Sequence, residues 1–283
     1  MKVLVSVDAE GLPGIYQFTQ IVPKYSAFAE LRKVMTEVAK AVAEVLQSEG
    51  FTEVWIADSH GHMGTIIYED LPDYVRLVRG FPRPLSMVPC INEGFSAVLF
   101  IGYHSGAGTV RSVLDHTYSS AAFHEIRING EKASEFYMNA LVAGHYGVPV
   151  ILVAGDDKLR EEVAQRTPWA EYVIAKRSLA RTSAVMEPLQ KFLRNLKEGV
   201  GRATKKLKEG LAKPLKINGP VTLEAVMRHT DYADAAEAVP GIVRVDAYTL
   251  KYVAQDIIEA YNVVEVLALI ALGLENIKAK LSG

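Results

Sequence analysis

Residues of the types that bind metal ions follow three separate apolar segments of the sequence. Asp8 and Glu10 come after VLVSV, Asp58 and His60 come after VWIA, and His104 comes after VLFIGY. Each segment predicts a buried strand, and the carboxyl ends of parallel strands form the edge of a sheet where ligands bind. We therefore expect these carboxylate and imidazole groups to meet at one edge, where they would hold a metal ion.

Each of these residues also has an ordinary structural explanation when it is taken alone. Asp8 could be a turn or capping residue, and Glu10 could simply be solvated. His60 could lie in a surface turn, and His104 could be a hydrogen-bonded histidine at the end of a strand. Their joint occurrence favours the metal site, because independent structural roles would rarely place all of them at one edge.

The ligand types indicate which metal and which chemistry the site would support. Imidazole together with carboxylate suits Zn, Mn, Co or Fe, whereas an all-oxygen set suits Mg or Ca. Two histidines with several carboxylates exceed what one tetrahedral ion requires. A carboxylate such as Asp8 can bridge two ions about 3.5–4 Å apart, which activate a water molecule and polarise a carbonyl group. The prediction is a metal-dependent hydrolase with two ions.

Two later segments supply further candidates. LDHTY contains His116, which would act as a base or nucleophile if it lies beside the metals. The alternative is a histidine on a surface loop. INGEKASEFYMNA begins with an Asn-Gly turn and continues as a helix. Glu131 and Glu135 are one helical turn apart in it, so one can face the site while the other caps the helix or meets solvent.

The spacing of apolar residues predicts an α/β fold with a mostly parallel sheet and helices on both faces. We expect buried strands over residues 3–7, 54–57, 97–101 and 148–154, and helices over residues 28–46, 133–146 and 157–166. Strands that alternate with helices are typical of this class. The sequence has no Walker loop, dinucleotide fingerprint, G-x-S-x-G elbow or H-E-x-x-H motif, which disfavours those kinds of site.

The last third of the chain differs in composition, and we place a domain boundary near Met186. Residues 1–186 would form the catalytic α/β domain, and residues 187–283 a smaller C-terminal α+β portion that packs against it and serves in assembly. In this portion we expect a solvated helix and linker over residues 191–216, a strand over 215–217, a helix over 222–228 and an apolar helix over 250–274. Because residues 191–216 are rich in Lys and Arg, a nucleic-acid patch is the alternative, although Glu198 and Glu209 dilute the charge.

Charge and cysteine content limit the partners and the compartment. The 283 residues carry 31 Lys and Arg against 33 Asp and Glu, and this formal net charge of −2 suggests neither a nucleic acid nor an anionic membrane as partner. Cys90 is the single cysteine, so no intrachain disulfide can form and a reducing, cytoplasmic location is expected. Asp8 and Glu10 interrupt the first apolar run before a signal-peptide core could form, and residues 263–272 are too short to span a bilayer.

Taken together, these motifs resemble those of the D-aminopeptidase family. The matching segments occur in the family's order and are spread over more than half of the chain. They are SVDAEG at residues 6–11, DSHGHM at 58–63, GYHSGAGT at 102–109, DHTY at 115–118, INGEKASEFYMNA at 128–140, VPVILVAGDD at 148–157 and KRSLARTSA at 176–184.

The resemblance implies a site and an assembly, which we state as expectations. The implied ligands of two zinc ions are Asp8 as the bridge, Glu10 and His60 for one ion, and His104 and Glu135 for the other. His116 would be the catalytic nucleophile or base. The implied substrate is a short peptide or amide with an N-terminal D-residue. The implied homo-oligomer is a decamer, with ten subunits in two stacked five-membered rings around a lumen.

Two other functions stay open at this point. The same two-metal site could serve another amidase or a phosphoesterase, because the metals support both chemistries. A ring-forming, peptide-binding scaffold with a structural metal is also possible, but His116 disfavours it because a structural site needs no base beyond its ligands. The group that receives a substrate amine is open too: Asp156 or Asp157 is available, although either could instead cap the following helix.

Overall fold

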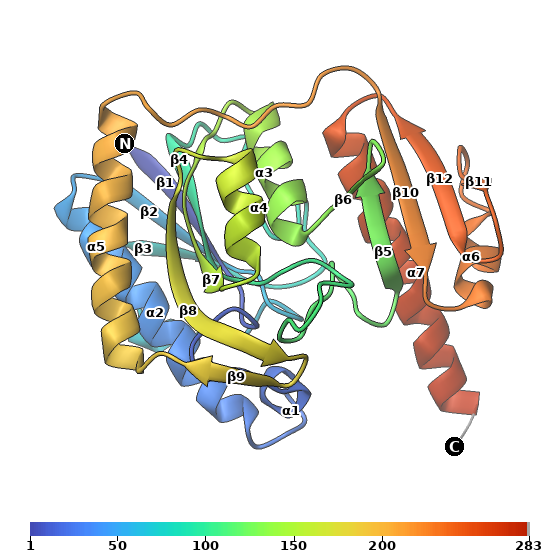
Figure 1. Cartoon of the computed structure of the whole chain (residues 1–283), viewed down its shortest axis with the longest axis horizontal. Helices are drawn as coiled ribbons and strands as arrows, with labels where there is room; N and C mark the ends of the chain where they lie inside the picture. Colours follow the sequence, from blue (N-terminus) through green and yellow to red (C-terminus); the bar gives the residue numbers. More distant parts are fainter. Residues whose placement is uncertain (282–283) are drawn as a thin grey trace.

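The computed structural model describes residues 1–281 and contains two β-sheets with helices around and between them (Figure 1). The first sheet has seven strands in the order β3-β2-β1-β4-β7-β8-β9. These strands are β1 (Lys2–Val7), β2 (Glu53–Asp58), β3 (Val75–Val78), β4 (Ala97–Tyr103), β7 (Val150–Asp156), β8 (Glu171–Ala180) and β9 (Ser183–Met186). Every neighbouring pair is parallel except β8 with β9, so the predicted mostly parallel sheet is confirmed.

Helices cover both faces of this sheet because its strands send apolar side chains into two cores. The helices are α2 (Phe28–Ser48) and α5 (Leu189–Lys208) on one face, and α3 (Glu135–His145) and α4 (Leu159–Arg166) on the other. Val3 and Val5 of β1 join the core under α2 and α5, whereas Leu4 between them joins the core under α3 and α4. This alternation is what a strand buried on both faces requires.

The second sheet has five strands in the order β11-β12-β10-β5-β6, all paired antiparallel. Its strands are β5 (Phe123–Ile128), β6 (Glu131–Lys132), β10 (Val221–Met227), β11 (Val243–Arg244) and β12 (Thr249–Ala254). The remaining elements are α1 (Phe18–Ile21), the 3₁₀-helix η1 (Tyr68–Asp70), α6 (Thr230–Ala236) and α7 (Ile257–Leu281). The helix α7 contacts α3 as well as α6, β10 and β12, so it joins the two sheets through one continuous core.

Three elements expected in the C-terminal part are wrong. Residues 222–228 form most of strand β10 rather than a helix, because VTLEAVM buries every second residue and so has the period of a strand. The expected helix over 250–274 begins only at Ile257, after strand β12, and Asp256 receives hydrogen bonds from the backbone of Ile258 and Glu259 at its start. No regular element forms over residues 215–217.

We expected a solvated helix in the basic segment, but the helix α5 that forms there is buried along one side. Phe192, Leu196 and Val200 are fully buried against the first sheet, while Lys206 pairs with Glu171 at 2.6 Å on the outer side. Spacing of three and four residues between its apolar positions accounts for this buried stripe. The domain boundary near Met186 stays a prediction, and any division of the chain has to place α5 with the first sheet and β5 and β6 with the second.

Within residues 1–281, α7 is the one helix that is long and apolar enough to cross a membrane. That is a weak sign of a membrane span, because core helices of soluble proteins meet the same criterion. Its inward side chains are buried, and they are Ile257, Ala260, Tyr261, Val264, Leu267 and Ala271. Val266, Leu269 and Leu272 are exposed, so the expected apolar helix is buried along one face only.

The placement of α5 predicts the effect of shortening its central aromatic side chain. Phe192→Ala should lower the free energy of unfolding by about 3–5 kcal/mol, because the fully buried ring leaves a cavity between α5 and the sheet. Lys205→Ala on the solvent side of the same helix should change it by less than about 0.5 kcal/mol. Guanidinium unfolding of both variants checks this, and equal effects would show that α5 is solvated after all.

Candidate metal centre

The predicted metal-binding residues converge at the carboxyl edge of the first sheet. Asp8 and Glu10 follow β1, and His60 and His104 follow its two neighbours β2 and β4. Glu135 is the first residue of α3, whose start is capped by the Ser134 hydroxyl accepting a hydrogen bond from the backbone of Tyr137. All five residues are buried, with at most 6% of any one exposed to solvent.

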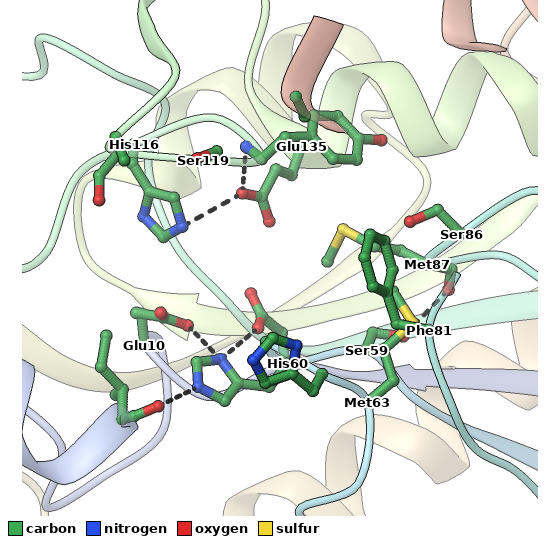
Figure 2. A pocket seen from close by; sticks show the side chains of 18 of the residues that line it. Glu10, Ser59, His60, Met63, Phe81, Ser86, Met87, His116, Ser119 and Glu135 are labelled. Atoms are coloured by element: carbon green, nitrogen blue, oxygen red, sulfur yellow. Dashed lines mark hydrogen bonds and ion pairs between the residues drawn. The ribbon is translucent and has the colours of Figure 1, made fainter. Parts of the chain in front are cut away.

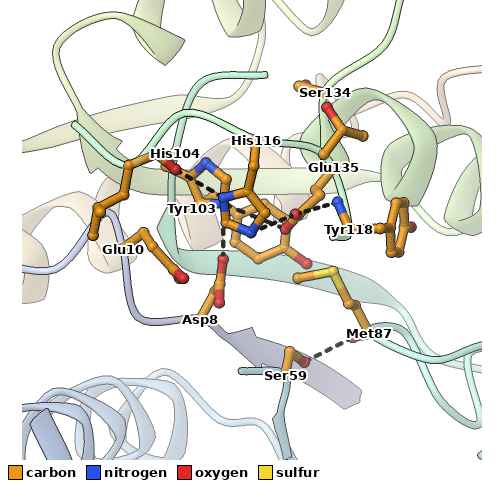
Figure 3. Close-up of polar contacts among 12 residues, drawn as sticks. Asp8, Glu10, Ser59, Met87, Tyr103, His104, His116, Tyr118, Ser134 and Glu135 are labelled. Carbon is orange, nitrogen blue, oxygen red and sulfur yellow. Dashed lines mark hydrogen bonds and ion pairs between the residues drawn. The ribbon is translucent and has the colours of Figure 1, made fainter. Parts of the chain in front are cut away.

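The two carboxylate oxygens of Asp8 face two different histidines, His60 and His104. Figure 3 shows the contact of Asp8 with His104. Oδ1 of Asp8 lies 3.5 Å from Nδ1 of His60, which is also 3.2 Å from Oε2 of Glu10. Oδ2 of Asp8 lies 3.6 Å from Nε2 of His104, which is also 3.6 Å from Oε2 of Glu135. Asp8 therefore stands between two sets of donors, as a carboxylate that bridges two cations would.

Backbone carbonyl groups orient the histidine rings. Nε2 of His60 lies 2.8 Å from the carbonyl oxygen of Ile21, and Nδ1 of His104 lies 3.0 Å from the carbonyl oxygen of Ser105. Because a carbonyl oxygen only accepts, each of these nitrogens must donate. The opposite ring nitrogens then point at the carboxylates with their lone pairs available, which is how protein histidines are held for metal binding.

The electrostatics of the cluster fit a cation. Oδ2 of Asp8, Oε2 of Glu10 and Nε2 of His104 are buried and have no hydrogen-bond partner among the described residues. Burial raises the pKa of Asp8 to about 7, and the charge of Glu10 adds to this effect. Burial opposes protonation of His104, but Glu135 and Asp8 outweigh it and raise the pKa to about 10. Protons and metal ions would therefore compete for the same atoms.

Among residues 1–281, two groups of three side chains place potential ligand atoms within 4.8 Å of one another. One consists of Asp8, Glu10 and His104, and the other of His104, His116 and Glu135. His104 belongs to both groups, so the two groups are adjacent parts of one cluster. The residues present therefore fit a pair of divalent ions of the kind that imidazole and carboxylate bind.

His116 lies beside this cluster rather than on a remote surface loop. Its ring stacks on that of His104 at 4.3 Å, and its Nε2 is 3.5 Å from Oε1 of Glu135. Its Nδ1 lies 2.8 Å from the carbonyl oxygen of Leu114, so Nδ1 donates and Nε2 faces the centre. Burial and the charge of His104 lower the pKa of His116, which favours a neutral ring that can accept a proton.

The residue spacing left open whether Glu131 or Glu135 faces the metal centre, and in the structure it is Glu135. Glu131 lies on β6, away from the centre, and forms an exposed ion pair with Arg166. Oε1 of Glu135 accepts a hydrogen bond of 2.7 Å from the backbone nitrogen of Tyr118, which leaves Oε2 toward His104.

Neither candidate for receiving a substrate amine lines the cavity beside this centre. Oδ1 of Asp156 accepts hydrogen bonds from the backbone of Lys158 and Leu159, so Asp156 stabilises the turn that leads into α4. Asp157 accepts a hydrogen bond from the backbone of Ser178 on β8. In this structure both side-chain carboxylates accept hydrogen bonds from backbone nitrogen atoms.

Several positions that hold the centre together had no clear signal in the sequence. Lys176 of β8 is fully buried, and its Nζ donates to the carbonyl oxygens of Glu10 and Ile15, so it holds the loop that carries Glu10. Gly11 and Gly102 let β1 and β4 approach at their ends, because a Cβ on Gly11 would lie 1.9 Å from the carbonyl oxygen of Tyr103. The glycines stood in the quoted motifs, but the contacts that require them depend on the tertiary structure.

A cavity of about 350 Å³ opens beside the cluster (Figure 2). His116 and Glu135 lie across it from Glu10 and His60, as Figure 2 shows. Its apolar lining includes Phe18, Met63, Phe81, Met87, Leu269 and Leu272. No Lys or Arg of the described residues 1–281 lines it, so the charged lining is acidic apart from the histidines. A small molecule could enter here and meet the cluster directly.

Comparisons with known proteins agree with this geometry. The profile of the peptidase M55 family, described as D-aminopeptidase, matches residues 1–266. The chain is 31% identical to a D-aminopeptidase of Bacillus subtilis (strain 168) over 274 residues, which cover 96% of this chain and 98% of that protein. A solved structure with a TM-score of 0.91 and 30% identity covers 96% of this chain and 98% of its own. It is described as the Zn-dependent D-aminopeptidase DppA from Bacillus subtilis, a self-compartmentalizing protease.

With a family match over nearly its whole length and a relative of this similarity, the chain belongs to the D-aminopeptidase family of peptidases, M55.

Proposed function

We propose that this protein is a zinc hydrolase with two ions per chain, which releases N-terminal D-amino acids from short peptides or amides. The observation that carries the proposal is the position of Asp8 between His60 and His104, with unpaired buried oxygens facing a cavity. Family membership and the zinc dependence of the Bacillus subtilis relative support the metal and the reaction class.

The proposed ligands divide into two sets that share Asp8. Glu10 and His60 complete one set, and His104 and Glu135 complete the other. Bound divalent ions supply a polarised substrate carbonyl and a water molecule of lowered pKa. Leu269 and Leu272 of α7 add apolar surface to the lining of the cavity beside these ligands.

His116 would act as the general base and acid. Its Nδ1–H is fixed on the carbonyl oxygen of Leu114, so Nε2 is the atom that can take a proton from the attacking water and return it to the leaving amine. Because Nε2 is 3.5 Å from a carboxylate oxygen of Glu135, the protonated ring would be stabilised by that charge. Asp115 positions the loop through a hydrogen bond from the backbone of Gly108 and an ion pair with Arg181.

We also propose that the chain assembles into a ring-shaped homo-oligomer in the cytoplasm, with ten subunits in two stacked rings. The relative is described as self-compartmentalizing, which requires subunits that enclose a space. The exposed side of α7, with Val266, Leu269 and Leu272, provides apolar surface that a second subunit could cover.

The bridging position of Asp8 predicts the metal content of a variant. Asp8→Asn should lose both ions, because an amide cannot supply two anionic oxygens to adjacent cations. Asp70→Asn, which changes an exposed carboxylate in η1, should keep two ions per chain. Metal analysis after dialysis measures both, and a variant that keeps one ion would show that Asp8 serves a single site.

The reaction class predicts both stereospecificity and metal dependence. Zinc-loaded protein should release the amine from D-alanine p-nitroanilide and not from the L-enantiomer, and a chelator should abolish the reaction until zinc is restored. The measurement is release of p-nitroaniline by absorbance. Hydrolysis of p-nitrophenyl phosphate without hydrolysis of either anilide would favour a phosphoesterase, and no turnover at full zinc occupancy would favour a peptide-binding scaffold.

The role of His116 predicts a separation of metal binding from turnover. His116→Ala should keep both ions and lower kcat by about 10²–10⁴-fold, as expected when a positioned base is removed. His124→Ala on β5, where the ring is exposed, should leave kcat unchanged. Metal analysis and steady-state kinetics decide the question, and loss of an ion from His116→Ala would make His116 a ligand instead.

A further inference from the structure

Among the described residues, Glu265 is the one carboxylate lining the cavity that the proposed metal centre does not use. It lies on α7 and shares the cavity with Asp8, Glu10 and Glu135. Among the described residues Glu265 forms no ion pair with a basic side chain, and no Lys or Arg lines the cavity. Because no basic side chain within residues 1–281 forms an ion pair with Glu265, this carboxyl group offers the cavity a second position for a cationic group.

The pairing of two helices brings Glu265 to this position. Oη of Tyr261 donates a hydrogen bond of 2.9 Å to Oδ1 of Asn139, which joins α7 to α3. On α3, Glu135 lies one turn before Asn139, and on α7, Glu265 lies one turn after Tyr261. Residues one turn apart share a helix face, so the same contact that joins the helices directs both carboxylates to the cavity.

The surroundings of Glu265 favour a cation as its partner. Burial raises the pKa of its carboxyl group, and the charge of Glu135 also raises it, while a hydrogen bond from Ser86 and the charge of Arg83 lower it. A cationic ligand stabilises the negative charge of a carboxylate most strongly when the group is partly desolvated and its charge is only partly balanced by the protein. If zinc ions neutralise Asp8, Glu10 and Glu135, Glu265 is the acidic group that remains for the substrate.

An aminopeptidase substrate carries such a cation in its N-terminal ammonium group. Only the α-carbon separates this group from the carbonyl that is attacked, so a site for the ammonium has to lie near the metal centre. The two aspartates that follow β7, Asp156 and Asp157, accept backbone hydrogen bonds and do not line the cavity. Glu265 lines it together with the apolar side chains of Leu269 and Leu272 from the next turns of α7.

We propose that Glu265 binds the N-terminal ammonium group of the substrate, in the cavity between α7 and the metal centre. This inference rests on the proposed aminopeptidase function. With the carbonyl at the metals and the ammonium at Glu265, two substituents of the α-carbon are fixed. The configuration of the α-carbon then determines the direction in which the substrate's side chain points. Glu265 therefore contributes to the choice between D- and L-residues.

The test compares two ligands that differ only in the amine. D-alanine hydroxamate and propionohydroxamate present the same metal-binding group, but only the first carries an ammonium. Calorimetric titration of the zinc-loaded full chain should show tighter binding of D-alanine hydroxamate. Glu265→Gln should weaken D-alanine hydroxamate by about 10- to 100-fold, the value of a lost charge-assisted hydrogen bond, and leave propionohydroxamate unchanged.

Two further variants serve as matched controls. Glu275→Gln removes an exposed carboxylate from the same helix and should change the binding of neither ligand. Glu265→Asp keeps the charge on a shorter side chain and should retain part of the preference for D-alanine hydroxamate. If Glu265→Gln weakens both hydroxamates equally, or weakens neither, the proposal is overturned.

The same experiment separates this inference from the proposed function. Wild-type protein that hydrolyses no D-aminoacyl anilide would contradict the proposed function. Selective loss of D-alanine hydroxamate binding in Glu265→Gln would still support the amine site in that case. Active wild-type protein whose Glu265→Gln variant keeps its KM and its preference for D-alanine hydroxamate would contradict the amine site alone.

Discussion

Three carboxylates and two imidazoles are buried together at the carboxyl edge of the first sheet, and the rest of the structure has to accommodate their charges. Asp8 is the centre of this arrangement, because each of its oxygens faces a different histidine at 3.5 or 3.6 Å. Burying such groups without compensation is costly, and none of the Lys or Arg side chains in residues 1–281 lines the adjoining cavity. The pair of divalent cations that we propose would compensate these charges and would also supply the chemistry.

The fold brings these groups together by simple means. The strand β1 lies between β2 and β4, so residues that follow three parallel strands meet although they are far apart in the sequence. Glu135 lies at the capped start of α3, and α7, which is joined to α3 by a hydrogen bond, contributes side chains to the wall of the cavity. Lys176 and the close approach of Gly11 to Tyr103 then fix the loop between β1 and α1.

The parts of this arrangement that depend on local pattern could be predicted from the sequence. Apolar runs ending in Asp8, His60 and His104 indicated strands of one parallel sheet, and the structure places these residues at its edge. The motif resemblance indicated Glu135 and His116, which the spacing of residues alone left undecided.

The parts that depend on distant contacts could not be predicted in this way. Residues 222–228 were expected to form a helix, but most of them belong to strand β10. The strands that pair with it, β5 and β12, come from segments about 100 residues before it and about 20 residues after it. Glu265 stood in an apolar helix, where only the pairing of α7 with α3 shows that it faces the cavity. Nothing in the sequence distinguishes Lys176 from the other basic residues, because its burial depends on the tertiary structure.

The most direct measurement of the central claim is anomalous diffraction at the zinc absorption edge from crystals of the zinc-loaded protein. If Asp8 bridges two zinc ions, the map shows two peaks per chain, about 3.5–4 Å apart, with one oxygen of Asp8 beside each. One peak should lie beside Glu10 and His60, and the other beside His104 and Glu135. A single peak, or peaks remote from Asp8, would contradict this bridging role.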